Sequence, residues 1–392
     1  MNKYIIIGII LFALPIGIPA QKSADDILIQ IEKNNTTLLA LRKKADAQKI
    51  GNKTGIYLQN PELEFNYLWG NPSSIGNRSD FNLRQSFDFP TAYGYKNKIA
   101  DLKNEQAELE YRKQVKVISL QVRIICIDLI YNNGLKSEYS KRLIHAQSVA
   151  NSFKSKFDAG ETGILEYNKA QINLLNLTNK MDLIDVERNA LLAELTRLNG
   201  DTTIDFTESD FSATIIPTNF EQWYTQAEQS NPLLNWLKQE IEISQKQVNL
   251  NQALSLPKFQ AGYMSETIVG QQFRGISVGL SIPLWENKNM VKSARANTLA
   301  LQAMETDSKL QFYNQLKNLH TKTIALQTNV LNYSSKLQQF NNSDLLKKAL
   351  DKGEISLIDY MIELTLYYQN VDKLLELKRD LNHTIAEMNQ FL

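Results

Sequence analysis

The chain has 392 residues, with 43 Lys and Arg against 42 Asp and Glu, one cysteine and nine prolines. This balance lacks the excess of positive charge with which proteins bind nucleic acids, so we expect no nucleic acid among its partners. Because Cys126 is the only cysteine, the chain cannot form an internal disulfide or a zinc site built from several thiolates. Burial of apolar surface, or assembly with other chains, must therefore stabilise the fold.

The first twenty residues are typical of a secretory signal peptide. Lys3 precedes an apolar run from Ile5 to Ile18, and the polar Gln21 follows Pro19 and Ala20. Proline and glycine interrupt the run, which disfavours the alternative of a membrane-spanning helix, since such a helix needs about 20 apolar residues. We therefore predict that residues 1–20 are a signal peptide. No cysteine lies near its end, so we expect no lipid anchor there.

Long stretches of the chain without proline have the pattern of helices. No proline lies between Pro90 and Pro217 or after Pro283, and apolar residues recur at spacings of three and four in both stretches. Helices of this length are unusual in a globular enzyme. The helices that we predict are Ser23–Tyr57, Tyr95–Phe157, Ile164–Asn199, Phe220–Ser255, Lys288–Leu350 and Ser356–Leu392.

The second half of the chain repeats the first. The segment from Asp158 to Tyr167 matches the segment from Asp351 to Tyr360, and the same offset of 193 relates Pro90 to Pro283. Internal repetition over such a distance is stronger evidence than a single motif. We therefore predict an internal duplication, with the repeats 21–218 and 219–392.

Four short segments alternate apolar and polar residues, as β-strands with one apolar face do. The neighbouring helices are too long to fold back over so small a sheet, which disfavours a soluble sheet on a core and favours lipid against this face. Lipid supplies no hydrogen bonds, and the smallest membrane barrels have about eight strands. Four strands cannot close, so we expect three copies to form a twelve-stranded transmembrane barrel. The predicted strands are Glu62–Trp69, Phe81–Phe89, Phe259–Tyr263 and Ile276–Ile282.

The duplication and its two glycine turns resemble the TolC family of outer membrane efflux proteins over essentially all of the mature chain. The resemblance implies a chain that is mainly α with a β membrane part, in which long helical hairpins form a periplasmic tunnel below a trimeric barrel. It also implies an outer membrane location, a periplasmic adaptor and an inner-membrane pump of the RND or ABC type as partners. The turns that carry it are Phe157-x-x-Gly160-Glu161-Thr162-Gly163-x-Leu165-Glu166-Tyr167 and Gly353-Glu354-Ile355-x-Leu357-Ile358-Asp359-Tyr360.

The same resemblance assigns roles to acids and turn residues. Asp359 lies six residues after Gly353, at the position of an acidic ring at the periplasmic mouth of family members. Three copies of Asp359, with Glu363 and with Glu166 at the equivalent place in the first repeat, would narrow the pore and favour cations. The alternative is a solvated acid at a helix N-terminus, where the helix dipole favours it. The tips expected to dock onto the adaptor are Gly160, Glu161, Thr162, Gly353, Glu354 and Ile355.

Four aromatic residues could form girdles at the membrane boundary, where amphipathic rings are favoured. They are Trp69, Tyr93, Tyr95 and Trp285, and ordinary packing is the alternative for each. His145, His320 and His383 have no ligand-type partner at helical spacing, so we predict that they lie on the surface or in packed regions. The sequence contains no nucleotide-binding, hydrolase or metalloprotease motif. We therefore expect no enzymatic activity, no cofactor and no metal site.

These observations favour a passive exit duct in a tripartite efflux system. The amino-acid sequences of the two tips resemble those of the outer components of heavy-metal efflux systems, which suggests metal cations as substrates. Export of drugs, or of proteins by a type I system, stays open. An alternative from another class is a structural periplasmic coiled-coil protein with a soluble sheet.

Overall fold

A computed structural model describes residues 23–212 and 215–391, and the predicted signal peptide lies outside this part of the chain. The chain divides into two compact units. Among the described residues, the first consists of 23–33, 125–212 and 343–375, and the second of 34–124, 215–342 and 376–391. Each unit thus takes segments from both predicted sequence repeats, whose boundaries stay a prediction.

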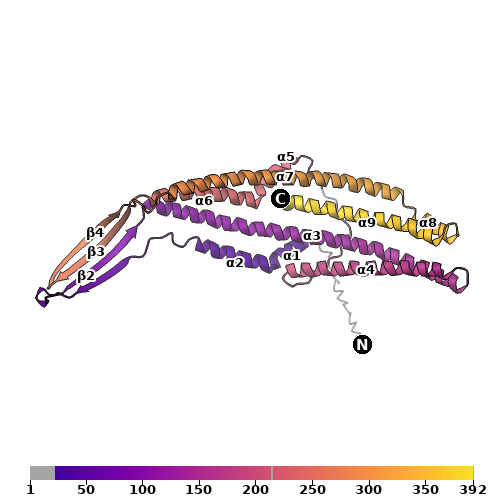
Figure 1. The fold of residues 1–392 in the computed structure, drawn as a ribbon, viewed down its shortest axis with the longest axis horizontal. Helices are drawn as coiled ribbons and strands as arrows, with labels where there is room; N and C mark the ends of the chain where they lie inside the picture. The colour runs from indigo at the N-terminus through magenta and orange to yellow at the C-terminus, as the bar shows by residue number, and fades with distance from the viewer. Residues whose placement is uncertain (1–22, 213–214, 392) are drawn as a thin grey trace, which may run out of the picture. The chain divides into compact units, whose positions relative to one another are not determined.

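The first unit is helical. It contains α1 (Ala24–Asn34), the later part of α3 (Pro90–Asp158), α4 (Ile164–Leu198), α8 (Ser343–Asp351) and the earlier part of α9 (Leu357–Met388). The chain turns back at a tight loop between α3 and α4, and again between α8 and α9 (Figure 1). The two hairpins share one apolar core, made by Ala150, Phe153, Ala170, Leu357, Tyr360 and Leu364.

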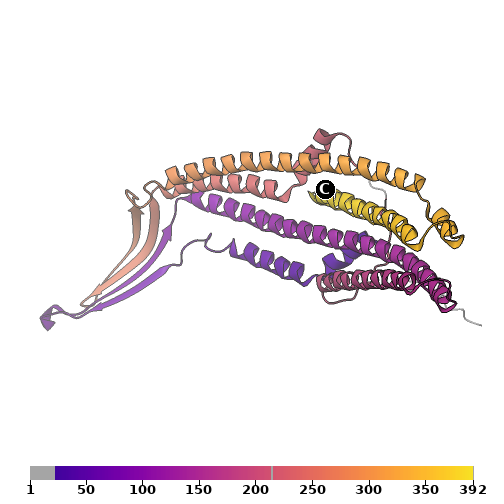
Figure 2. The same ribbon diagram turned by 45° about the vertical axis from the view of Figure 1, so that its right-hand side comes forward.

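The second unit combines helices with a sheet. Its helices are α2 (Thr36–Gly51), the earlier part of α3, α5 (Phe220–Ser230), α6 (Pro232–Leu254), α7 (Met290–Gln339) and the end of α9 with a short 3₁₀ turn at Asn389–Phe391. α6 runs alongside α7 in both views (Figures 1 and 2). One core joins α5, α7 and α9 around Trp223, Leu316 and Met388, and a second joins α3 to α6 around Ile99 and Ile243.

The sheet of the second unit has four antiparallel strands in chain order. They are β1 (Glu62–Leu68), β2 (Arg78–Phe87), β3 (Lys258–Ile268) and β4 (Gln271–Ser281), and a 3₁₀ turn at Ser73–Ile75 lies between β1 and β2. The prediction of four strands is confirmed. β3 and β4 are longer than the sequence pattern suggested, because ladder pairing continues beyond the apolar residues to Ile268 and Gln271.

The register places most of the apolar residues of the four strands on one face. Leu63 pairs with Leu83, Leu83 with Tyr263, and Tyr263 with Ile276, so an apolar row crosses the whole sheet. The next residues along the strands form polar or small rows on the opposite face, such as Glu62, Arg84, Gly262 and Ser277. The apolar face is not covered, since the side chain of Ile276 is 84% exposed. The predicted alternation is therefore present, and its apolar side lacks a partner within the described chain.

Two of the predicted helices are wrong as single helices. The stretch 23–57 forms α1 and α2, because the Asn35 side chain accepts a hydrogen bond from the Leu38 amide (2.9 Å) and so caps a new helix. The stretch 220–255 breaks in the same way at Asn231, which caps α6 through the amides of Leu233 (2.8 Å) and Leu234 (3.3 Å). Pro232 then occupies the first position of α6, where a missing N–H costs nothing.

A third predicted helix, Lys288–Leu350, also divides. α7 ends before Phe340, whose amide donates to the carbonyl of Lys336 (3.1 Å), and α8 begins at Ser343. The two asparagines between the helices favour turns over helix interiors, since their side chains compete for backbone hydrogen bonds. In contrast, α3 starts earlier than predicted, at Pro90 itself. Among the described residues, no helix has the length and apolar character required to span a membrane.

A carboxylate on α3 ties α2 to it. Glu108 Oε2 lies 2.8 Å from both Arg42 Nη1 and Lys49 Nζ, and the guanidinium of Arg42 stacks 3.7 Å from the ring centre of Tyr111. Hydrogen bonds from Arg42 and then Lys49 lower the pKa of Glu108 from 4.5 to about 2. The folded state therefore holds the ionised form of Glu108 more tightly than the unfolded chain does.

This clamp predicts an acid-dependent loss of stability. A carboxyl group with a lowered folded-state pKa contributes stability above its unfolded value of 4.5, and the contribution disappears as the pH falls toward 2. We expect Glu108→Gln to cost about 1 kcal/mol at pH 7, a figure that allows for solvent screening of the partly exposed partners. The free energies of unfolding of Glu108→Gln and of the parent protein, measured with denaturant from pH 7 to pH 3, should therefore converge.

Glu110→Gln is the matched control, because Glu110 contacts Gln114 (3.3 Å) and Lys113 (3.6 Å) of its own helix. Its cost should be smaller. If the difference in unfolding free energy between Glu108→Gln and the parent protein stays constant from pH 7 to pH 3, the acid-dependent role of Glu108 is contradicted.

Candidate functional site

The hairpin of α3 and α4 ends in a Schellman turn, which is a common way to close a helix with glycine. The Gly160 amide donates to the carbonyl of Phe157 (3.0 Å), and the Glu161 amide donates to that of Lys156 (2.8 Å). Gly160 has φ +75°, a left-handed conformation that side chains other than glycine adopt with strain. The glycine singled out in the sequence therefore fixes the shape of this tip.

The hairpin of α8 and α9 ends in the same turn. The Gly353 amide donates to the carbonyl of Leu350 (3.0 Å), the Glu354 amide donates to that of Ala349 (2.9 Å), and φ of Gly353 is +72°. Each of these residues lies 193 positions after its counterpart in the first tip. The two tips thus have equivalent backbones.

The helices that leave the two tips begin differently. α4 follows Gly163, which offers no side-chain cap, whereas α9 follows Ser356. The Ser356 hydroxyl accepts a hydrogen bond from the Asp359 amide (3.2 Å) and donates one to Asp359 Oδ2 (2.6 Å). Ser356 is therefore an N-cap whose hydroxyl also pairs with the Asp359 carboxylate. Asp359 therefore has a local structural role at the start of α9.

The predicted pore acids lie on the exposed side of these helix starts. Asp359 and Glu363 are exposed and one helical turn apart on α9. Glu166 is half-buried and pairs with Lys169 of its own helix (2.8 Å), so part of its charge is balanced locally. Asp359 and Glu166 each occupy the first turn of their helix, where the helix dipole favours an acid. The helix-terminus account of these acids thus holds, and it is compatible with a role at a pore.

The tip residues are not equally accessible. Gly160, Glu161, Gly353 and Glu354 are exposed, whereas Thr162 is half-buried. Ile355 packs against the core shared by the two hairpins, next to Leu357 and Tyr360. The exposed part of each tip is therefore a glycine followed by a glutamate.

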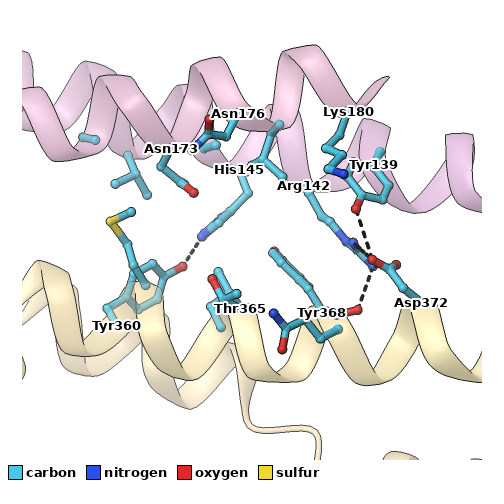
Figure 3. A pocket seen from close by; sticks show the side chains of 17 residues that line it. Tyr139, Arg142, His145, Asn173, Asn176, Lys180, Tyr360, Thr365, Tyr368 and Asp372 are labelled. Carbon is cyan, nitrogen blue, oxygen red and sulfur yellow. Dashed lines mark hydrogen bonds and ion pairs between the residues drawn. The ribbon is translucent and has the colours of Figure 1, made fainter. Parts of the chain in front are cut away.

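A buried arginine joins α3 to α9 within the first unit, and the sequence analysis did not single it out. Arg142 is 2% exposed and forms two hydrogen bonds with Asp372, at 2.6 Å and 3.0 Å (Figure 3). Its guanidinium lies 4.5 Å from the ring centre of Tyr139 and 4.4 Å from that of Tyr368. Such a pair is strongly directional, since a planar guanidinium matches a carboxylate with two parallel bonds. The i, i+3 spacing of Tyr139 and Arg142 on one face of the helix was the available signal.

A second polar contact joins the same helices. His145 Nε2 lies within hydrogen-bonding distance of the Tyr360 hydroxyl (Figure 3). Burial lowers the pKa of His145, and the nearby Lys347 acts in the same direction, while Asp351 acts against both. Burial also raises the pKa of Tyr360, so both groups stay neutral at pH 7. Within residues 23–212 and 215–391, no group of three or more His, Cys, Asp or Glu is placed to hold a metal ion.

The predicted girdle residues differ in their surroundings. Trp69 and Trp285 are 77% and 80% exposed, just beyond the ends of β1 and β4. Tyr93 accepts a hydrogen bond from the Asp88 amide (3.0 Å), and Tyr95 packs on the core between α3 and α6. The two tryptophans are thus exposed and could contact lipid or solvent, whereas the two tyrosines have contacts within the chain.

The tip geometry predicts that position 160 accepts asparagine better than alanine. A Cβ added at this position meets no neighbouring atom, because the space around it is empty within 4 Å. Gly160→Ala should cost about 1 kcal/mol from the left-handed φ alone, and Gly160→Asn should cost less, since asparagine tolerates this conformation. Thermal unfolding of the purified variants measures the difference. Equal losses for the two variants would contradict a backbone origin.

Solved structures show what this fold resembles, although no protein-family model and no curated protein matches the chain. The Campylobacter jejuni CmeC outer membrane channel aligns over 94% of this chain and 85% of its own, with a TM-score of 0.75 and 14% identity. The outer membrane protein VceC of Vibrio cholerae aligns over 93% and 94%, with a TM-score of 0.76 and 12% identity. CusC, described as forming a transmembrane channel, aligns over 93% and 91%, with a TM-score of 0.76 and 11% identity. The chain therefore has the fold of the TolC-family outer membrane channels, mainly helical with four antiparallel strands.

Proposed function

We propose that the chain is the outer membrane channel of a tripartite efflux system and acts as a trimeric, passive exit duct without catalysis. The observation that carries the proposal is the uncovered apolar face of the four-stranded sheet. In the described chain the outer strands β1 and β4 each have a neighbour on one side only. In lipid such edges must be closed by other protein strands, because no water is present to pair with them. Three copies, as in the fold it shares, supply twelve strands.

The dimensions of the sheet suit an outer membrane. β3 and β4 have 11 residues each, within about the 9–11 residues that a tilted strand uses to cross the bilayer. Trp69 follows β1 at the end where Leu68 pairs with Arg78, and Trp285 follows β4 at the opposite end, where Lys258 pairs with Ser281. One exposed tryptophan thus lies beyond each end of the apolar face, as expected for two aromatic girdles.

The tips supply the periplasmic end of the proposed duct. The equivalent exposed Gly-Glu turns at Gly160 and Gly353 offer two similar docking points per chain, six per trimer, for a periplasmic adaptor that connects to an inner-membrane pump. Asp359, with Glu363 one turn further, would form a carboxylate ring at the mouth, and Glu166 would contribute less because Lys169 pairs with it. A ring of carboxylates attracts cations.

We propose metal cations as the substrates, because of this acidic ring and of the amino-acid sequences of the tips. The sequence of the neighbouring genes tests this choice directly. An adaptor and a metal-type pump beside this gene would support it, and a drug-type or type I secretion pump would replace it while leaving the channel proposal intact.

The channel proposal predicts that charge is tolerated on one face of β4 and harmful on the other. Ile276→Lys places a charge on the apolar face, where lysine costs about 2–4 kcal/mol near the middle of a bilayer. Gly275→Lys is the matched control, because residue 275 is on the opposite face and has open space around it. We expect Ile276→Lys to reduce strongly the trimer recovered from outer membranes, and Gly275→Lys to leave it near the parental amount.

Recovery of both variants in equal amounts would contradict lipid contact at this face. Recovery of the parent protein in the soluble periplasmic fraction would instead favour the structural coiled-coil alternative.

The proposed ring predicts a change in ion selectivity. Asp359→Asn removes the charge but keeps a side-chain oxygen that can accept the hydrogen bond from Ser356, so the helix start should survive. We expect the reversal potential of the channel in planar bilayers, measured under a salt gradient, to shift toward that of a less cation-selective pore. Asp351→Asn is the control, because Asp351 is an exposed acid of α8 paired with Lys347 (3.2 Å). Unchanged selectivity in Asp359→Asn would remove this residue from the mouth.

A further inference from the structure

The first unit contains a cavity that the channel proposal does not use. It has a volume of about 430 Å³ and lies among α3, α4 and α9 (Figure 3). This volume falls in the range of small-molecule sites, about 300–1,000 Å³. All of the lining residues belong to the first unit.

Two polar contacts bound the cavity at opposite ends. The contact between His145 and Tyr360 lies at one end, and the pair of Arg142 with Asp372 lies at the other (Figure 3). The acid at the second end is fully engaged, because Asp372 also accepts a hydrogen bond from the Tyr139 hydroxyl (3.1 Å). Arg142 Nε is buried and has no hydrogen-bond partner among the described residues. A cation entering here would therefore find no free carboxylate.

The wall formed by α4 carries the unpaired positive charge. Lys180 lines the cavity and takes part in no ion pair or hydrogen bond within the described chain, and the same is true of Asn173 and Asn176 on this helix. From the facing helix α9, Thr365 and Gln369 add neutral polar groups. With Arg142 neutralised by Asp372, Lys180 gives the cavity a net charge of one positive unit. A ligand with a single negative charge would match it.

The rest of the lining is apolar or aromatic. It consists of Ala146, Val149, Ala170, Leu177, Met361 and Leu364, together with the rings of Tyr139, Tyr360 and Tyr368. A flat apolar body gains from burial against such a surface, at about 25 cal/mol per Å² removed from water. Inorganic phosphate would leave this surface unused and would need more than one unpaired cation.

We infer that this cavity binds an amphipathic organic anion, with a compact apolar or aromatic body and a single carboxylate or sulfonate. The body lies against the apolar lining and the tyrosine rings, and the anionic group pairs with Lys180 beside the amides of Asn173 and Asn176. This site goes beyond the proposed export function, because it belongs to each protomer and needs no pump, adaptor or lipid. A bound ligand would contact both hairpins and so stabilise the folded state by mass action.

The test uses 2-naphthoate as the probe, with the full-length protein in detergent and isothermal titration calorimetry as the measurement. We expect saturable binding of one 2-naphthoate per chain. Lys180→Gln should weaken it by about tenfold, the equivalent of about 1.4 kcal/mol for one charge-assisted contact. Thr365→Trp, a substitution at an exposed position that fills the cavity, should abolish binding without disturbing the core. Lys154→Gln should not change the affinity, because Lys154 is paired with Asp158 on α3 and does not line the cavity.

Charge-altered probes sharpen the experiment. Methyl 2-naphthoate and 2-naphthylmethylamine share the ring system but are neutral and cationic, and both should bind more weakly than 2-naphthoate. The inference is overturned if 2-naphthoate shows no saturable binding, if its affinity is the same in Lys180→Gln and Thr365→Trp as in the parent, or if the amine binds more tightly. These measurements do not depend on membrane insertion or transport. Their failure would therefore not contradict the channel proposal, nor would failure of the channel proposal contradict them.

Discussion

In the proposed outer membrane location every backbone hydrogen bond of the sheet must be made to protein, and this constraint would govern the second unit. The apolar row from Leu63 to Ile276 leaves one face of the sheet apolar and uncovered, while β1 and β4 have unpaired outer edges in the described chain. A single copy can satisfy neither requirement. In that location the sheet would be complete only as part of a larger closed structure, so the proposed assembly follows from the strand count of one chain.

The two tips keep the same backbone turn, but the side chains that follow the turn differ. Gly160 and Gly353 have the same left-handed φ and the same two hydrogen bonds, because that turn depends on the absence of a Cβ. The residues that precede α4 and α9, three positions after these glycines, differ: they are Gly163 in the first tip and Ser356 in the second. The second acid, Asp359, is consequently held by the hydroxyl of the capping serine, Ser356, whereas Glu166 pairs with Lys169. Two tips with one shape thus present different electrostatics.

Much of this fold could be predicted from the sequence, because its signals are periodic and repeated. Alternation gave the faces of the strands, and glycine gave both tips. The helix breaks at Asn35 and Asn231 escaped prediction because a cap is a local competition between one side chain and the continuing helix, and periodicity averages over it. The Arg142–Asp372 pair escaped for a different reason. Its residues are 230 positions apart, and only the packing of α3 against α9 brings them together.

The interior of the first unit combines two kinds of packing that act differently. The apolar core around Phe153 and Leu364 supplies burial energy, which is non-directional and so does not by itself select one alignment of the helices. The buried Arg142–Asp372 pair contributes little net stability, since its desolvation offsets the attraction. It has one good geometry, however, and a shift along α9 would leave a buried charge alone. We therefore assign to this pair the alignment of the two hairpins, and to the apolar core their cohesion. The cavity lies between this pair and the His145–Tyr360 contact, so its shape is set by the two contacts that have a fixed geometry.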